Sequence, residues 1–422
     1  MIGGYQANAS QLNKIRFRPD PYHQWTTNET GAVINKEPLN LMSSTFTMPK
    51  LFRTSLTLEK KFTNGWSLIW EAMFSKNLSE IFYTNLNLLP PIDKAVGPDN
   101  RNIYSISNNG KIPLNADGSN PFDYAILLGN NKGEKGYSQQ LTTTLTKKMR
   151  AGWALEINYS IGNAQAVNDG TASVNVNQWK FNETVNGKNL LSLSQSDFSS
   201  GHRIFVWANK KITGDNKKMA FTISLVYTGQ TGSPFSFVYG GFSMVRDAGI
   251  FGNEDLVYIP STDDLTKMSF LPNIFNGIVY TAEQQIESFE KYIQSNDYLK
   301  SRRGMYAERN GSRLPFSHTI DIKMKQDFFL KIGKGHYQIQ LSLDIFNLAN
   351  LINSNWGWRY LLPNDQYELL SFAGYKSNPD FTPQYRFNPQ ILQMTPWDVS
   401  QSTSPAYSSL WTGQMGFRLI IK

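Results

Sequence analysis

Polar and apolar residues alternate between Pro315 and Gln326 and again from Tyr337 to Ile345, and this pattern limits the possible folds of the chain more than any other. A short break, Gly333-Lys334-Gly335, divides the alternation into two arms. A period of two places successive side chains on opposite faces of a strand, and two strands across a short glycine-containing break form an antiparallel hairpin. The segment therefore predicts a hairpin with one almost uninterrupted apolar face and one charged face.

The same hairpin recurs around three other turns, Thr63-Asn64-Gly65, Arg150-Ala151-Gly152 and Thr213-Gly214-Asp215-Asn216. Each arm has about ten residues, enough for a tilted strand to cross a bilayer, whereas soluble strands more often have about five or six. A soluble sandwich with its polar face in water also produces alternation, but the number and length of these hairpins favour a membrane barrel. Such a barrel places its apolar face on lipid and its polar face on a wet lumen.

Long segments without sustained alternation separate the hairpins. Short periplasmic turns and long extracellular loops are typical of membrane barrels, so the four turns are expected at the periplasmic end. The segments expected at the extracellular end are 76–136, 163–200, 229–312 and 348–408. One helix is predicted within the third of them, where Thr281 and Gln284 have capping-box spacing. The chain is expected to end on a strand.

The domain division follows from the same pattern. Residues 1–50 show no sustained periodicity and are predicted to be a long loop or an incomplete barrel segment, and residues 51–422 the barrel itself. The first residues lack the charged and apolar regions of an export signal. A barrel chain of this kind is expected to be a processed form or part of a longer protein.

Composition excludes several other classes of protein. No apolar run of about eighteen residues occurs, which argues against helical membrane spans. The formal charge is +8, but the basic residues are scattered and form no nucleic-acid-binding motif, so no nucleic-acid partner is predicted. With no cysteine, four isolated histidines and no nucleophile motif, we expect no catalytic residue, no metal site and no cofactor.

The candidate functional residues come from the strand faces. Charged and amide side chains on the polar faces are expected to line the lumen, since a basic residue on lipid costs about 2–4 kcal/mol near the midplane. They are Arg53, Glu71, Glu156, Arg203, Asp321, Lys323, Gln338, Gln340 and Asp344. Trp66 and Trp153 each follow a tight turn on the apolar face, as an interfacial aromatic girdle requires. The alternative for these two tryptophans is a place in an ordinary hydrophobic core.

Five runs of residues, in order, resemble the C-terminal barrel of Oar-like TonB-dependent receptors of the Bacteroidota type. They are Ser196-Asp197-Phe198 with Gly201-His202-Arg203, Tyr227–Ser236, Asp255–Pro260, Asp297-Tyr298-Leu299 with Ala307–Gly311, and Asp344–Asn353. Phe46-Thr47-Met48-Pro49 fits the same pattern, and the resemblance covers roughly residues 15 to 422. Two departures are a carboxylate-poor run at Phe242–Gly249 and the non-aromatic ending Ile421-Lys422.

The resemblance implies an all-β fold, an antiparallel transmembrane β-barrel with long extracellular loops. This chain would supply only the C-terminal half, about ten to fourteen strands of a barrel of about 22 strands with a plugged lumen. The implied location is the outer membrane of a Gram-negative cell, in contact with outer-membrane lipid. The implied partner is the TonB complex, which would act through an N-terminal part that this chain lacks.

The function expected from this family is energy-coupled uptake of an unidentified substrate. A non-transporting surface adhesin or a structural outer-membrane barrel is the alternative, and a soluble all-β carbohydrate-binding protein belongs to a third class. Half a barrel leaves two unpaired strand edges, so the chain is expected to form an open sheet.

Overall fold

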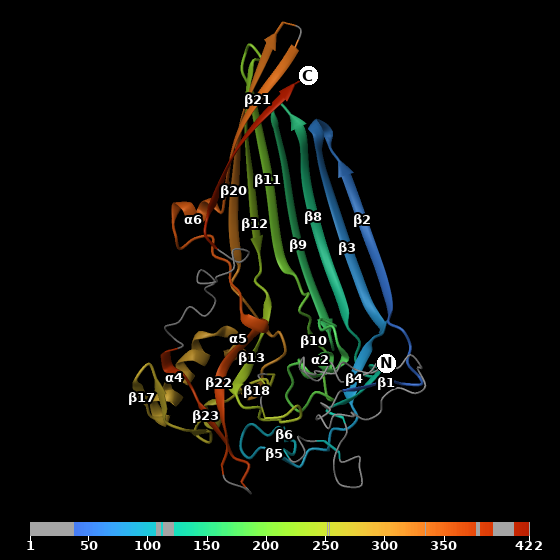
Figure 1. Ribbon diagram of the computed structural model, residues 1–422, viewed down its shortest axis with the longest axis vertical. Coiled ribbons are helices and arrows are strands. Elements are labelled where there is room, and N and C mark those ends of the chain that lie inside the picture. The colour runs from blue at the N-terminus through green and yellow to red at the C-terminus, as the bar shows by residue number, and fades with distance from the viewer. Residues whose placement is uncertain are drawn as a thin grey trace, which may run out of the picture.

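The computed structural model describes residues 38–106, 111–112, 122–250, 252, 254–333, 335–376, 380–390 and 409–421. It has two regions (Figure 1). One is a sheet of long antiparallel strands, which we call the wall. The other, which we call the loop end, consists of the shorter strands and most of the helices, gathered at one end of the wall.

Nine long strands form the wall, in the order β2-β3-β8-β9-β11-β12-β20-β21-β24. A short tenth strand, β10 (Ser194–Gln195), pairs with β9 off this path. The long strands are β2 (Lys50–Lys61), β3 (Trp66–Ser79), β8 (Tyr137–Arg150), β9 (Trp153–Ala166), β11 (Gly201–Thr213), β12 (Met219–Gln230), β20 (Ser317–Ile332), β21 (Gly335–Phe346) and β24 (Thr412–Ile421). The mostly β, antiparallel character predicted from the alternation is confirmed, and the last described residues form a strand.

The four short turns all lie at the same end of the wall, as predicted (Figure 1). Asn64 and Gly65 have φ of 69° and 80°, and Ala151 and Gly152 have φ of 51° and 76°. Two successive residues with positive φ match the twist of the flanking strands and give tight hairpins. Asparagine and glycine accept this backbone readily, which explains the turns that the sequence predicts.

The wall strands are strongly staggered. Cross-strand pairing defines a row of neighbouring residues across the sheet: Trp66, Lys147, Leu155, Ala208, Leu225, Ile322 and Ile345. Trp66, at one end of this row, directly follows its turn, whereas Ile345, at the other end, is the last residue but one of β21. A row that climbs from one end of the strands to the other is the stagger of tilted strands in a barrel wall.

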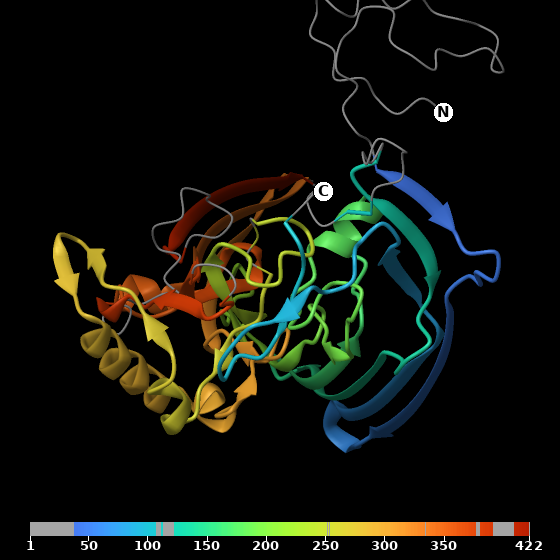
Figure 2. The same cartoon turned by 90° about the horizontal axis from the view of Figure 1, so that it is seen from below.

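The sheet is open. Its path ends at β2 and β24, and neither edge has a second partner among the described strands. The described residues therefore contain no closed barrel, as expected for half of one, and the ten strands of the sheet match the lower limit of the expected number. Seen along the strands, the sheet is curved, with β2 and β24 on different sides (Figure 2).

The loop end contains five small sheets and short helices. Its strands are β1 (Leu39–Met42), β4 (Ile81–Asn85), β5 (Asp93–Lys94), β6 (Asn102–Ile103), β7 (Ala125–Asn130), β13 (Pro234–Gly241), β14 (Tyr258–Ile259), β15 (Ser269–Phe270), β16 (Asn273–Phe275), β17 (Ile278–Tyr280), β18 (Met305–Tyr306), β19 (Ser312–Arg313), β22 (Gln366–Tyr375) and β23 (Pro383–Arg386). The helices of the chain are α2 (Asn175–Lys180), α3 (Thr262–Leu265), α4 (Ala282–Ser295), α5 (Asp297–Ser301) and α6 (Leu348–Ile352), with 3-10 turns at Thr63–Gly65 and Pro363–Asp365. No helix of the described residues is both long and apolar enough to span a membrane.

The predicted helix is confirmed as α4. The Gln284 backbone N–H donates to the Thr281 hydroxyl at 3.3 Å, and the Thr281 N–H donates to the Gln284 side-chain carbonyl at 2.9 Å. This reciprocal pair satisfies two backbone donors that a helix start otherwise leaves unpaired. Phe289 and Ile293 are fully buried on one face of the helix.

The long segments differ from the predicted loops because the loop end has its own hydrophobic core. Aromatic rings from distant segments meet there: Phe289 lies 5.0 Å from Phe387 and 6.4 Å from Phe270, measured between ring centroids. Three of its strand pairs, β1 with β7, β13 with β22 and β15 with β23, are parallel. Pairs this distant in sequence leave no local periodicity, so alternation does not predict them.

Residues 1–37 lie outside the described residues. Within 38–50, Leu39–Met42 form β1, which pairs in parallel with β7. That residues 1–50 are a long loop or an incomplete barrel segment stays a prediction. Four residues held by a non-local partner are too short to show a period. The wall then starts with β2 at Lys50.

Candidate functional site

Cross-strand pairing places all nine predicted lumen-facing residues on one face of the wall. Arg53, for example, pairs with Ser75, which lies on the same face as Glu71 because the two are an even number of residues apart on β3. Pairing across strands and even spacing along each strand, followed from β2 to β21, place all nine residues on this face: Arg53, Glu71, Glu156, Arg203, Asp321, Lys323, Gln338, Gln340 and Asp344. We call this the polar face. That it lines a lumen stays a prediction.

Hydrogen bonds between β20 and β21 hold part of the polar face together. The Lys323 ammonium lies 2.9 Å from the Asp344 carboxylate. Asp327, which the sequence analysis did not select, accepts hydrogen bonds from the amides of Gln338 and Gln340 at 3.0 and 2.8 Å. Cross-strand polar pairs of this kind stabilise a sheet by about 0.2–1 kcal/mol each.

The other predicted residues of this face make fewer polar contacts through their side chains. The Arg53 guanidinium donates to the Ser75 hydroxyl at 3.1 Å, and the Asp321 carboxylate accepts the Asn347 backbone N–H at 2.8 Å. The side chains of Glu71, Glu156 and Arg203 make no hydrogen bond or ion pair within the described part of the chain. The structure therefore shows a polar surface rather than one converging constellation of these nine residues.

The opposite face of the wall is apolar and exposed. Leu56 on β2 is 62% exposed, and Met415 and Phe417 on β24 are 84% and 69% exposed. Leu341 in the middle of the sheet also remains exposed. Large apolar side chains left open across a whole sheet indicate a surface that is normally covered by something apolar. We call this the apolar face.

Trp66 and Trp153, predicted at equivalent positions, lie in contact on the apolar face near the turns. Their rings meet edge to face with centroids 5.9 Å apart. The ammonium of Lys147 lies 4.2 Å from the centroid of Trp153 and 5.9 Å from that of Trp66, within the range of cation–π attraction. The sequence predicted the two tryptophans but not the lysine between them.

A second set of aromatic pairs lies further along the apolar face, towards the loop end. The Tyr159 hydroxyl is 2.8 Å from His202 Nδ1, and the Tyr227 hydroxyl is 2.9 Å from His318 Nδ1. Both pairs have ring centroids 6.1 Å apart. Along β9, Tyr159 is about 20 Å from Trp153 at the usual rise per residue. Amphipathic rings thus lie near both limits of the apolar face.

A second candidate site is a cavity of about 850 Å³ at the loop end. Its wall combines several carboxylates with one guanidinium, that of Arg309, and two exposed phenylalanine rings, those of Phe181 and Phe198. The carboxylates belong to Asp169, Glu183, Asp197, Glu254 and Asp365. A cavity with convergent polar groups and a few aromatic rings is the usual form of a binding site for a small polar ligand.

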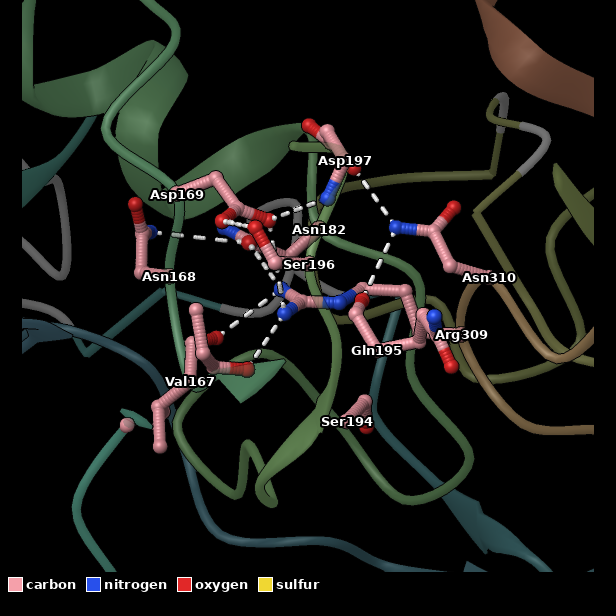
Figure 3. A network of polar contacts seen from close by, with 12 residues as sticks. Val167, Asn168, Asp169, Asn182, Ser194, Gln195, Ser196, Asp197, Arg309 and Asn310 are labelled. Atoms are coloured by element: carbon pink, nitrogen blue, oxygen red, sulfur yellow. Dashed lines mark hydrogen bonds and ion pairs between the residues drawn. The ribbon is translucent and has the colours of Figure 1, made fainter. Parts of the chain in front are cut away.

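Arg309 organises one side of this cavity (Figure 3). Its guanidinium donates to the backbone carbonyls of Ala166 and Val167 at 2.5 and 2.9 Å, and lies 3.7 Å from the Asp169 carboxylate. Arg309 and Asp169 are both almost fully buried. Because β9 ends at Ala166, this side chain ties the loop end to a strand of the wall.

The neighbouring Asn310 positions a second carboxylate. Its backbone has φ of 57°, and its side-chain amide donates to Asp197 at 2.6 Å and to the Gln195 carbonyl at 3.0 Å (Figure 3). The Asp197 N–H in turn donates to Asp169 at 3.1 Å. Segments around 169, 197 and 309 are therefore joined by one polar network.

The negative charges of the carboxylates in the cavity outnumber the positive charges near them. Burial raises the pKa of Glu183, although a hydrogen bond from Gln366 opposes the shift. Burial also raises the pKa values of Asp197 and Glu254, and burial together with the nearby Asp197 charge raises that of Asp365. Glu254 has a cationic partner in Lys188, at 3.8 Å. Arg309 and Lys188 together still leave an excess of negative charge over the five acidic groups, so the cavity favours ligands that carry positive charge or several hydroxyl groups.

Sequence reasoning missed this cavity because its residues come from segments up to two hundred positions apart. The available signal was the motif set of the family resemblance: Asp197 and Phe198 belong to one run, and Arg309 and Asn310 to another. Among the described residues, no group of three or more His, Asp or Glu side chains is placed to hold a metal ion.

Comparison with known proteins adds no relative. No family model matches the chain, and a comparison with curated proteins finds no match. The resemblance to Oar-like receptors thus depends on the motifs quoted above.

Proposed function

We propose that this chain forms part of the wall and surface loops of an outer-membrane receptor of the TonB-dependent type, which takes up a substrate in an energy-coupled step. The observation that carries the proposal is the exposed apolar face, which extends across nine antiparallel strands opposite a face of charged and amide residues. In this proposal the apolar face contacts outer-membrane lipid and the polar face lines the lumen.

The energetics of the apolar face support a lipid environment. Full burial of a leucine, phenylalanine or methionine side chain contributes about 1.5–3 kcal/mol relative to water. If this face stayed in water, the free energy of burying these side chains would be lost on every strand. Lipid supplies the cover for the whole face at once, while the backbone groups stay paired within the sheet.

The two ends of the wall support an orientation. Tight turns at one end and a folded loop end at the other match the asymmetry of outer-membrane barrels. The loop end is then extracellular, and its cavity is where a ligand is first bound. The open edges at β2 and β24 are where further strands of a larger barrel would pair, and the TonB complex would act through a part that precedes this chain.

The absence of cysteine from the sequence allows a direct test of the membrane claim. Single cysteines replace Gln340, Leu341, Ser342 or Leu343, and the full chain is reconstituted into vesicles. A membrane-impermeant thiol reagent should label the cysteines at 340 and 342, whereas those at 341 and 343 should react only after detergent is added. Equal labelling of all four, or a chain that stays monomeric in plain buffer, would refute the proposal.

A second test separates uptake from a surface role without transport. A plug domain encoded ahead of residue 1 in the same reading frame, together with substrate accumulation that depends on the proton-motive force, supports uptake. Binding of a ligand at the cell surface without accumulation would instead favour an adhesin or a structural barrel.

A further inference from the structure

Three of the four hairpins carry two adjacent lysines shortly before the turn: Lys60-Lys61, Lys147-Lys148 and Lys210-Lys211. Adjacent residues on a strand point to opposite faces. Each pair therefore places one lysine on each face of the wall. The fourth hairpin differs, because it has Leu330-Lys331 at this position.

Cross-strand pairing shows which lysine of each pair lies on the apolar face. Lys147 pairs with Trp66, and Lys210 pairs with Trp153, so both share the face of the two tryptophans. Lys60 pairs with a leucine two residues beyond Trp66, on the same face. Three ammonium groups thus lie at the turn side of a face that is mainly apolar.

These ammonium groups are not neutralised within the described part of the chain. Lys147 is only 6% exposed, and its ammonium makes the two cation–π contacts with Trp66 and Trp153 but no ion pair there. Lys60 makes no hydrogen bond or ion pair with described residues, and the Lys210 ammonium donates only to the Ala151 carbonyl, at 3.3 Å. Positive charge held at the border of an apolar surface is complementary to an anion that also carries an apolar chain.

We propose that Lys60, Lys147 and Lys210 bind the phosphate groups of anionic phospholipids, of the phosphatidylglycerol class, at the turn-side border of the apolar face. This inference rests on the proposed membrane location and adds a lipid site to it. The acyl chains lie on the apolar residues, and the headgroup lies beside the lysines.

The chemistry of the residues fits this ligand. A lysine ammonium is a compact point charge that binds phosphate well, and its long stem reaches along apolar surface to the headgroup level. The contact of the Lys147 ammonium with two rings restricts this side chain before phosphate binds, so less side-chain entropy is lost on binding. A free phosphate ion would gain nothing from the adjoining apolar surface, which is why the site is assigned to lipid.

The experiment compares two triple variants of the full chain. The site variant is Lys60→Gln, Lys147→Gln, Lys210→Gln, and the matched control is Lys61→Gln, Lys148→Gln, Lys211→Gln. Each variant removes three positive charges. The lysines changed in the control directly follow those changed in the site variant and lie on the opposite face of the wall. Each protein is reconstituted in phosphatidylcholine bilayers, and the immobilised fractions of spin-labelled phosphatidylglycerol and spin-labelled phosphatidylcholine are measured.

The unsubstituted protein and the control should both prefer phosphatidylglycerol, and the site variant should lose most of that preference. A lysine near an anionic headgroup corresponds to about a fivefold change in binding per residue. High salt should reduce the preference because it screens the charges. The inference is overturned if both triples lose the preference equally or neither does. If neither lipid is immobilised by any protein, the membrane proposal itself fails, and this result differs from the loss of selectivity alone.

Discussion

The wall and the loop end are built from the same kinds of residue but bury them differently. Among the described residues, the only buried hydrophobic residues that lie on the nine long strands are Ala154 and Ala220. The loop end, in contrast, buries large aromatic residues such as Phe237, Tyr239 and Phe289 completely. One region has its own hydrophobic core, and the other has an apolar face without one.

This difference shows that the two regions depend on different surroundings. The loop end gains its stability from apolar surface that it removes from water by itself. The strands of the wall are hydrogen-bonded to one another, but its apolar face has no partner among the described residues, so the packing of that face has to come from outside the chain. Stability measured in water should therefore report the loop end, and stability measured in bilayers should report the wall.

The largest expected effect is in the core of the loop end. Phe289→Ala removes a fully buried ring and leaves a cavity, so we expect a loss of about 3–5 kcal/mol in local unfolding free energy. Hydrogen exchange of the α4 amides measures it. Leu56→Ala, on the exposed apolar face, serves as the control and should leave α4 protection unchanged. Similar losses for both variants would show that the two regions unfold together.

A comparable effect is expected where the two regions are joined. Arg309→Met leaves the Asp169 carboxylate and the carbonyls of Ala166 and Val167 without their donor, at a cost of about 3–5 kcal/mol. Faster hydrogen exchange should appear around residues 166–169 while the wall hairpins keep their protection. Lys291→Met, which breaks an exposed ion pair with Glu287, is the control and should change stability by about 0.5 kcal/mol or less. Unchanged exchange in Arg309→Met would mean that other contacts hold the loop end to β9.

A smaller effect distinguishes the two faces of the wall. Leu341→Arg places a charge on the apolar face and should reduce stability in vesicles by about 2–4 kcal/mol, since lipid cannot solvate it. Ser342→Arg, one residue away on the polar face, should cost far less. Folding into bilayers at increasing denaturant measures both. Equal costs would contradict a lipid contact on one face alone.

The smallest effect is a pH dependence of the loop end. Burial raises the pKa of Glu183, so the folded state binds this proton more tightly than the unfolded state does. Its contribution favours folding at low pH and is lost as pH rises from the ordinary glutamate pKa through the raised one. Glu183→Gln should remove this loss and make the loop end relatively more stable at neutral pH. Denaturation of both proteins at several pH values measures the difference, and parallel curves would contradict a raised pKa.

The hairpins could be predicted from the sequence alone, because alternation with a period of two and the turn residues are local properties. Asn64, Gly65 and Gly152 favour tight turns because asparagine and glycine accept a positive φ readily. The capping box at Thr281 specified the start of α4 for the same reason. Strand register, once the hairpins form, then places residues such as Glu71 and Asp321 on one face.

The contacts between segments that are distant in the chain could be seen only in the tertiary structure. The parallel pairing of β13 with β22, the rings that meet around Phe289 and the carboxylates that surround Arg309 all join residues far apart in the chain. No local period records such contacts, since their stability comes from burial that exists only after the chain has folded. Lys60, Lys147 and Lys210 show both origins. The lysine pairs are visible in the sequence, but cross-strand register places these three on the apolar face, on alternate strands of the wall.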